Sequence, residues 1–121
     1  MTPELQSISD FPGVTGLCLH RGAQVMEHSL PASYGDAAAA NLCQSIAGAF
    51  IAYADAGRPL MQSYFQFPES GVLVLTSSPE GQSQPSPAED FFLTFLVSDQ
   101  SAISGILAPA RAFLARQALG A

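Results

Sequence analysis

Two histidines and a nearby acid are the side chains of this chain best suited to acid/base or metal chemistry. His20 and His28 flank a glycine turn at Gly22, and Glu27 lies next to His28. On a two-stranded hairpin these groups could lie near one another, and imidazole and carboxylate are zinc ligands. The spacing offers no third ligand, so we expect solvent-exposed hairpin histidines, with a metal site or an acid/base pair as the alternatives.

The cysteines and the paired carboxylates point less strongly to chemistry. Cys18 and Cys43 are the only cysteines, too few for a disulfide framework or for a four-ligand zinc site within one chain. We therefore expect two buried thiols that act as small hydrophobic groups. Glu89 and Asp90 adjoin a polar segment, where we expect both carboxylates to be solvated.

Motifs for nucleophilic or nucleotide chemistry are missing from the sequence. There is no Gly-x-Ser-x-Gly elbow, no P-loop and no dinucleotide-binding glycine pattern. The sequence therefore predicts no enzymatic activity, no catalytic residue, no cofactor and no metal. An enzyme that uses His20 and His28 is the competing hypothesis.

Charge and hydropathy narrow the classes of partner. The four cations are all arginines, ten acids give a net charge of -6, and only 12% of residues are charged against 48% hydrophobic. Nucleic acids and anionic membranes both require clustered cations. The apolar runs are shorter than the ~20 residues that span a bilayer, and the acidic N-terminus is unlike a secretory signal. We expect a cytoplasmic protein with an apolar, weakly charged surface that favours a permanent partner.

The hydrophobic periodicity predicts one α+β domain over residues 1–121. A short helix, capped by Thr2 and running through Ile8, is followed by a hairpin, a long helix and three strands. A terminal helix follows, capped by Ser98 or Asp99 and kinked or divided by Pro109. The predicted long helix is Asp36–Ala56. The predicted strands are Val14–His20, Gln24–Leu30, Leu60–Phe67, Val72–Thr76 (expected near the centre of the sheet) and Phe91–Val97. Residues 77–90, rich in proline and serine, are predicted to form a flexible loop.

The long helix carries two apolar stripes, and a helix with two apolar faces needs two surfaces to cover it. We assign the stripe of larger side chains to the core of the domain (Leu42, Ile46, Ala49, Phe50 and Tyr53). The second stripe is made mostly of small residues, which let another helix approach closely, and we assign it to a second copy of the chain (Ala39, Cys43, Ala47, Ile51 and Ala54).

The strand after this helix also calls for a partner. It is uncharged, and an exposed uncharged edge strand aggregates unless it is paired or covered. Alternation of side chains places Leu60, Gln62, Tyr64 and Gln66 on one face. We add these four residues to the predicted dimer interface.

The order of elements, together with three local patterns, resembles the roadblock family, which is related to dynein light chains of that name and to bacterial partners of Ras-like GTPases. The patterns are Phe11-Pro12-Gly13-Val14-Thr15-Gly16 at the start of the hairpin, Gly22-Ala23-Gln24-Val25 at its tip, and the small-residue helix that leads into Leu60–Phe67. The resemblance covers nearly the whole chain. The chain departs from it at Arg21, where the family usually has an acidic residue, and in the length of the 77–90 loop.

The resemblance implies a profilin-like, five-stranded antiparallel sheet with the long helix on one face and the N- and C-terminal helices on the other. It also implies a homodimer in which the long helices pack together and the third strands pair edge to edge. The function it implies is a non-enzymatic scaffold or regulator that binds a small Ras-like GTPase or a related assembly. The alternative is a PAS-like or profilin-like sensor with a small-molecule pocket between the long helix and the sheet, lined by Tyr53, Tyr64, Phe65 and Phe67.

Overall fold

The computed structural model describes residues 1–77 and 87–120 and confirms the predicted order of elements. The predicted flexible loop falls largely on residues 78–86, outside the described residues. The helices and strands are α1 Pro3–Ser9, β1 Val14–Arg21, β2 Gln24–His28, α2 Asp36–Asp55, β3 Gln62–Gln66, β4 Gly71–Thr76, β5 Phe91–Val97, the 3₁₀ turn η1 Gln100–Ala102, and α3 Ile103–Gly120.

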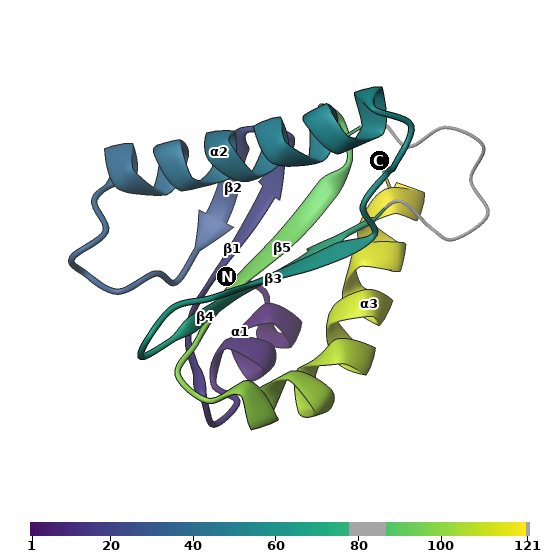
Figure 1. Cartoon of the computed structure of the whole chain (residues 1–121). Coiled ribbons are helices and arrows are strands. Elements are labelled where there is room, and N and C mark those ends of the chain that lie inside the picture. The colour runs from purple at the N-terminus through teal and green to yellow at the C-terminus, as the bar shows by residue number, and fades with distance from the viewer. Residues whose placement is uncertain (78–86, 121) are drawn as a thin grey trace.

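The five strands form one antiparallel sheet in the order β2-β1-β5-β4-β3. Its central strand is β5, buried along its whole length, and β4, which we expected near the centre, is the interior strand between β5 and the edge strand β3. In Figure 1, α2 crosses one face of the sheet, and α1 and α3 lie on the other. This is the predicted α+β architecture.

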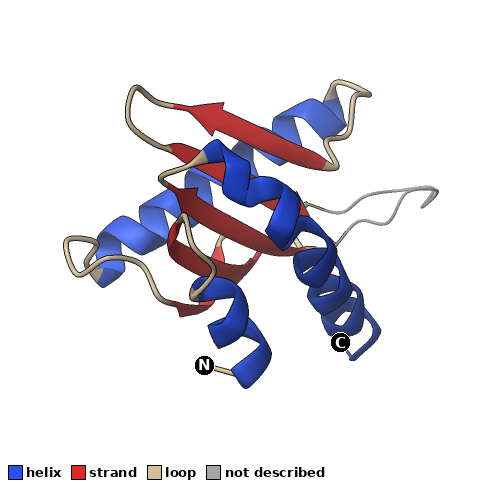
Figure 2. Ribbon diagram, turned by 90° about the horizontal axis from the view of Figure 1, so that it is seen from below, coloured by secondary structure: helices blue, strands red, loops and turns tan. Residues whose placement is uncertain are grey.

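The core on the side of α1 and α3 is continuous and made of hydrocarbon side chains. Figure 2 views the molecule from this side, with both helices in front of the strands. Burying such side chains is the main favourable contribution to folding, roughly 1.5–3 kcal/mol each. The cluster contains Leu5, Ile8, Leu17, Leu19, Leu73, Leu75, Phe91, Leu93, Phe95, Val97, Ile106, Ala110, Phe113 and Leu114.

The core beneath α2 is divided. One cluster joins the first half of the helix to β1 and β5 through Cys18, Leu30, Ala39, Cys43 and Leu96. The other joins its second half to β4 and β5 through Ile46, Phe50, Val74 and Phe92. Two polar side chains on this face of the sheet, His20 and Thr94, are both fully buried. The seam under α2 is thus less hydrophobic than the opposite side.

The C-terminus of α2 is closed by Gly57, directly after the predicted end of the helix at Ala56. Gly57 has φ +79°, and the amides of Gly57 and Arg58 bond back to the carbonyls of Ala54 and Tyr53. This pair of bonds is the Schellman motif. By length and composition alone α2 could cross a membrane, contrary to our expectation from the apolar runs, but its buried residues pack on the sheet of the same chain.

The terminal helix is not divided at Pro109. Asp99 caps η1 through its carboxylate, and α3 then runs unbroken to Gly120 with Pro109 inside it. Figure 1 shows α3 bending between its green start and its yellow end. A bend relieves the clash between the proline ring and the preceding turn without ending the helix.

Candidate association surface on α2 and β3

The two histidines are not the exposed hairpin pair that we expected. His20 is 0% exposed: its Nδ1 lies 2.8 Å from the carbonyl oxygen of Gly22, and its Nε2 lies 2.8 Å from Oγ1 of Thr94. Because a carbonyl oxygen only accepts, Nδ1 carries a proton. His28 is half-buried and pairs across the hairpin with Cys18, not with His20.

Both histidines of the hairpin have partners within the chain: Nδ1 of His28 accepts from the amide of Leu30 at 3.3 Å, and its Nε2 lies 3.9 Å from Oδ1 of Asp36. Both ring nitrogens of His20 are occupied by neighbours in the protein, so neither is presented to a substrate. Among residues 1–77 and 87–120, no group of three or more His, Cys, Asp or Glu side chains is placed to hold a metal ion. Of the paired acids, Glu89 is exposed as expected, whereas Asp90 is partly buried.

The space between α2 and the sheet, where the sensor alternative placed a ligand, is filled by side chains. Phe50 packs edge-on against Phe92, with ring centroids 5.1 Å apart, and neither ring is more than 1% exposed. The four aromatic residues proposed to line that pocket do not gather there, since Tyr53, Phe65 and Phe67 are exposed and Tyr64 packs on the opposite face.

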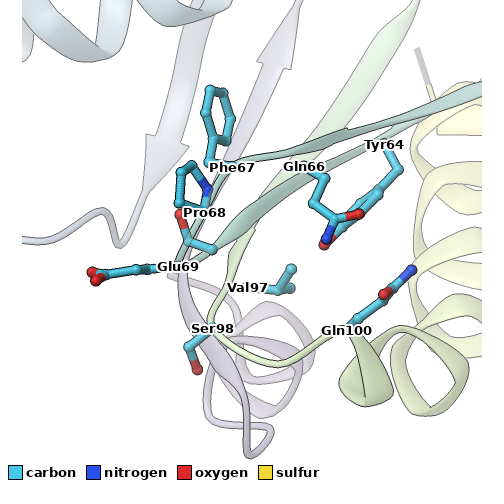
Figure 3. A pocket seen from close by; sticks show the side chains of 9 residues that line it. Tyr64, Gln66, Phe67, Pro68, Glu69, Val97, Ser98 and Gln100 are labelled. Atoms are coloured by element: carbon cyan, nitrogen blue, oxygen red, sulfur yellow. The ribbon is translucent and has the colours of Figure 1, made fainter.

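A shallow hollow of about 180 Å³ lies elsewhere, at the β3–β4 turn beside the end of β5 and the start of η1. Figure 3 shows Tyr64 and Gln66 extending from β3 toward the side of Gln100, whereas Phe67 extends the opposite way. The hollow is open and smaller than the ~300–1,000 Å³ typical of ligand pockets. It gives the sensor alternative no support.

The structure corrects our assignment of the α2 stripes. Ala39, Cys43 and Ala47 are at most 3% exposed and pack on the chain's own sheet, so they cannot contact a partner. Ile51 and Ala54 are half-buried at the margin. The other stripe is also divided: Ile46 and Phe50 are core residues, Leu42 and Ala49 are half-buried, and Tyr53 is 51% exposed.

The outward face of α2 is a third stripe that we did not identify from the sequence. It consists of small, uncharged and exposed residues at alternating spacings of three and four, namely Ala38, Asn41, Ser45, Gly48 and Ala52. No charged side chain occurs between Asp36 and Asp55. A surface helix normally places charges on such a face, and this absence of charge over five turns was visible in the sequence.

The placement of β3 is partly as predicted. It is an edge strand and, among the described residues, pairs only with β4. Gln62 and Tyr64 face α3, since Gln62 bonds Arg111 and Tyr64 packs on the α1/α3 core. Gln66 lines the hollow on that side, whereas Leu60 precedes the strand and packs under α2. Leu60 therefore does not share a face with the other three.

Phe65 and Phe67 are the large side chains of this segment that lie exposed on the α2 side. They are 40% and 53% exposed, and Tyr53 at the end of α2 is similarly open. We define the association surface as the outward stripe of α2, these three aromatic residues and the free edge of β3. Small side chains let a second helix approach closely, aromatic rings supply contact area, and the strand edge offers backbone donors and acceptors.

Comparisons with known proteins agree on the fold. No protein-family model matches the chain, and no curated protein sequence matches it. Several solved structures do match the chain. The gliding protein MglB from Thermus thermophilus superposes with a TM-score of 0.72 at 18% identity, covering 98% of this chain and 87% of that one.

Two further structures extend this result. An MglB described as having a tetrameric arrangement gives a TM-score of 0.62 at 17% identity, covering 95% of this chain and 87% of that chain. A Roadblock/LC7 domain from Streptomyces avermitilis gives 0.59 at 13% identity, covering 91% and 92%. The resemblance noted in the sequence is thus confirmed at the level of the fold, which is the roadblock fold.

Proposed function

We propose that this roadblock-fold protein is a non-enzymatic homodimeric regulator that associates through α2 and β3 and binds a small Ras-like GTPase. The observation that carries the dimer is the outward face of α2, which is exposed, has small side chains and lacks charge between Asp36 and Asp55. Isolated apolar side chains are common on protein surfaces, but a continuous uncharged face of this length indicates an interface.

A two-fold dimer would cover both parts of the surface with one operation. Antiparallel packing of α2 against its copy buries the small-residue stripe, and pairing of the two β3 edges continues the sheet across the axis. The edge of β3 carries no charged residue and no proline to prevent such pairing. The solved MglB described as tetrameric supports self-association in this fold.

The GTPase partner is supported by resemblance and not by a site. The roadblock pattern in the sequence implies a partner of this class, and the superposition on MglB structures agrees with it. If such a regulator promotes GTP hydrolysis, we expect it to do so by ordering the catalytic groups of its client, since both ring nitrogens of His20 are occupied within the fold.

Molar mass by light scattering after size exclusion, across a dilution series, tests the dimer. We expect a concentration-independent mass near twice the 12.6 kDa of one chain. Ser45→Glu places a charge on the outward stripe while improving helix propensity, so we expect it to shift the mass toward the monomer with the fold retained. A wild-type monomer at all concentrations would overturn the proposal.

Ser104→Glu is the matched control, since Ser104 is also an exposed helical serine but lies on α3, away from the association surface. It should leave the mass unchanged. If both variants dissociate alike, the effect is general charge repulsion and the α2 face is not the interface.

The client is tested separately, by titrating the protein with purified small GTPases of the same organism in their GDP and GTP-analogue forms. Calorimetry should show saturable binding that depends on the nucleotide. No binding to any of them would overturn the GTPase assignment while leaving the dimer intact.

A further inference from the structure

The two cysteines lie side by side beneath α2. Sγ of Cys18 on β1 and Sγ of Cys43 in the middle of α2 are 3.4 Å apart, and both side chains are fully buried although they are 25 residues apart in the chain. We propose that these thiols form a reversible disulfide that ties α2 to β1 when the protein meets a hydroperoxide.

The surroundings of the pair favour reaction over inert packing. The thiol of Cys18 hydrogen-bonds Cys43, which lowers the pKa of Cys43, and the nearby His20 lowers it further against the opposing effect of burial. The same hydrogen bond and burial raise the pKa of Cys18. Because the thiolate is the nucleophile, Cys43 is the attacking sulfur and Cys18 the one that resolves the intermediate.

The reaction balances with hydrogen peroxide as the oxidant. The Cys43 sulfur attacks one peroxide oxygen, the O–O bond breaks, and the other oxygen leaves as water after protonation, which gives a sulfenic acid. The Cys18 sulfur then attacks the Cys43 sulfur, the S–O bond breaks, and the hydroxyl leaves as water with the thiol proton of Cys18. Two thiols and one hydrogen peroxide give one disulfide and two waters.

The packing around the two cysteines allows the disulfide to form. A disulfide brings the sulfurs to about 2.05 Å, so α2 and β1 must approach or the side chains must rotate. The residues of α2 on this seam are small, with Ala39 one turn before Cys43 and Ala47 one turn after it. Both thiols are fully buried, so the peroxide must reach them through local opening of this seam, which two separate clusters hold.

Intact mass spectrometry of the full-length protein, treated with a hydrogen peroxide series and then quenched, tests the proposal. We expect a mass loss of about 2 Da, the two thiol hydrogens, that is reversed by a dithiol reductant. Peptide mapping without reduction should recover Cys18 linked to Cys43. The oxidised form should melt roughly 5–10 °C higher, since the bond constrains the unfolded chain.

Single serine variants assign the roles. With Cys18→Ser, the sulfenic acid on Cys43 has no resolving thiol, so dimedone should label Cys43. Cys43→Ser should reduce labelling of the remaining Cys18 by about tenfold or more, since burial still raises the pKa of the Cys18 thiol after Cys43 is removed and leaves little thiolate. Circular dichroism checks that both variants are folded.

The wild-type experiment decides the matter even if a variant unfolds. A free cysteine peptide in the same tube serves as the reference for oxidant strength. If the peptide is fully oxidised while the protein keeps both thiols, the proposal is overturned. It is also overturned if the protein's cysteines link between chains or are oxidised separately without joining.

Discussion

The imidazole of His20 on β1 and the hydroxyl of Thr94 on β5 form a buried hydrogen bond of 2.8 Å across the middle of the sheet. The ring also stacks on Phe92, with centroids 4.9 Å apart and an interplanar angle of 3°. Nδ1 donates to the carbonyl oxygen of Gly22, so both ring nitrogens have a hydrogen-bond partner. A polar side chain in a core is tolerated when its hydrogen bonds are complete.

Thr94→Val should therefore destabilise the protein while nearly preserving its shape. The substitution leaves Nε2 of His20 buried without a partner, which costs about 1–3 kcal/mol of the free energy of unfolding. Urea denaturation measures the loss. Thr15→Val is the control, because Oγ1 of Thr15 bonds the carbonyl oxygen of Leu96 at 3.1 Å from an exposed position where water can replace it. Equal stability for the two variants would contradict the role assigned to His20.

The order and type of the main elements could be predicted because each has a local cause. Hydrophobic periodicity indicated the strands. The end of α2 has a local cause in Gly57, because glycine readily adopts the left-handed conformation that closes a helix, as it does here. The effect of Pro109 was harder to predict. A proline ring clashes with the preceding turn of a straight helix, but the bend of α3 relieves this clash, so the proline stays inside the helix.

The sequence alone could not show which face of α2 packs on the sheet. Both stripes that we identified are apolar, and the sheet receives a set drawn from each: Ala39, Cys43 and Ala47 with Ile46 and Phe50. Small side chains bring the helix close to β1, where a larger side chain would hold it away. The burial of His20 was missed for a related reason, since its hydrogen-bond partner Thr94 is 74 residues away in the sequence.

Ala47→Glu tests this corrected orientation of α2. Ala47 is 3% exposed against the sheet, so a glutamate there buries a charge without a partner and should cost about 3–5 kcal/mol, much of the stability of a small domain. Denaturation followed by circular dichroism measures it. Ala112→Glu, on the exposed side of α3, should stay within about 0.5 kcal/mol of wild type. A folded, stable Ala47→Glu protein would show that this stripe faces outward after all.

Asp99 should make the stability of the protein depend on pH. The amide of Ser101 donates to its carboxylate at 3.0 Å, and this backbone bond, followed by the side chain of Ser101, lowers the pKa of Asp99 below its ordinary value. A lowered pKa means that the stabilisation is complete above the unfolded pKa and is lost as pH falls through the folded one. Urea midpoints of wild type and Asp99→Asn should therefore converge below about pH 4. A difference that stays constant through the acid range would contradict this assignment.

The turn between β1 and β2 can be tested by substituting Gly22, with Gly57 at the end of α2 as the matched control. Both have positive φ, +52° and +79°, but a Cβ on Gly22 would overlap the carbonyl group of Ala88, whereas one on Gly57 would meet open space. Gly57→Ala should cost only the left-handed backbone penalty of about 1–2 kcal/mol. Gly22→Ala should cost more, because the amide of Gly22 also bonds the carbonyl oxygen of Asp90 at 3.0 Å and the turn cannot move away without breaking that bond. Chemical denaturation of the two variants gives the comparison, and equal losses would show that the contact between Gly22 and Ala88 yields without cost.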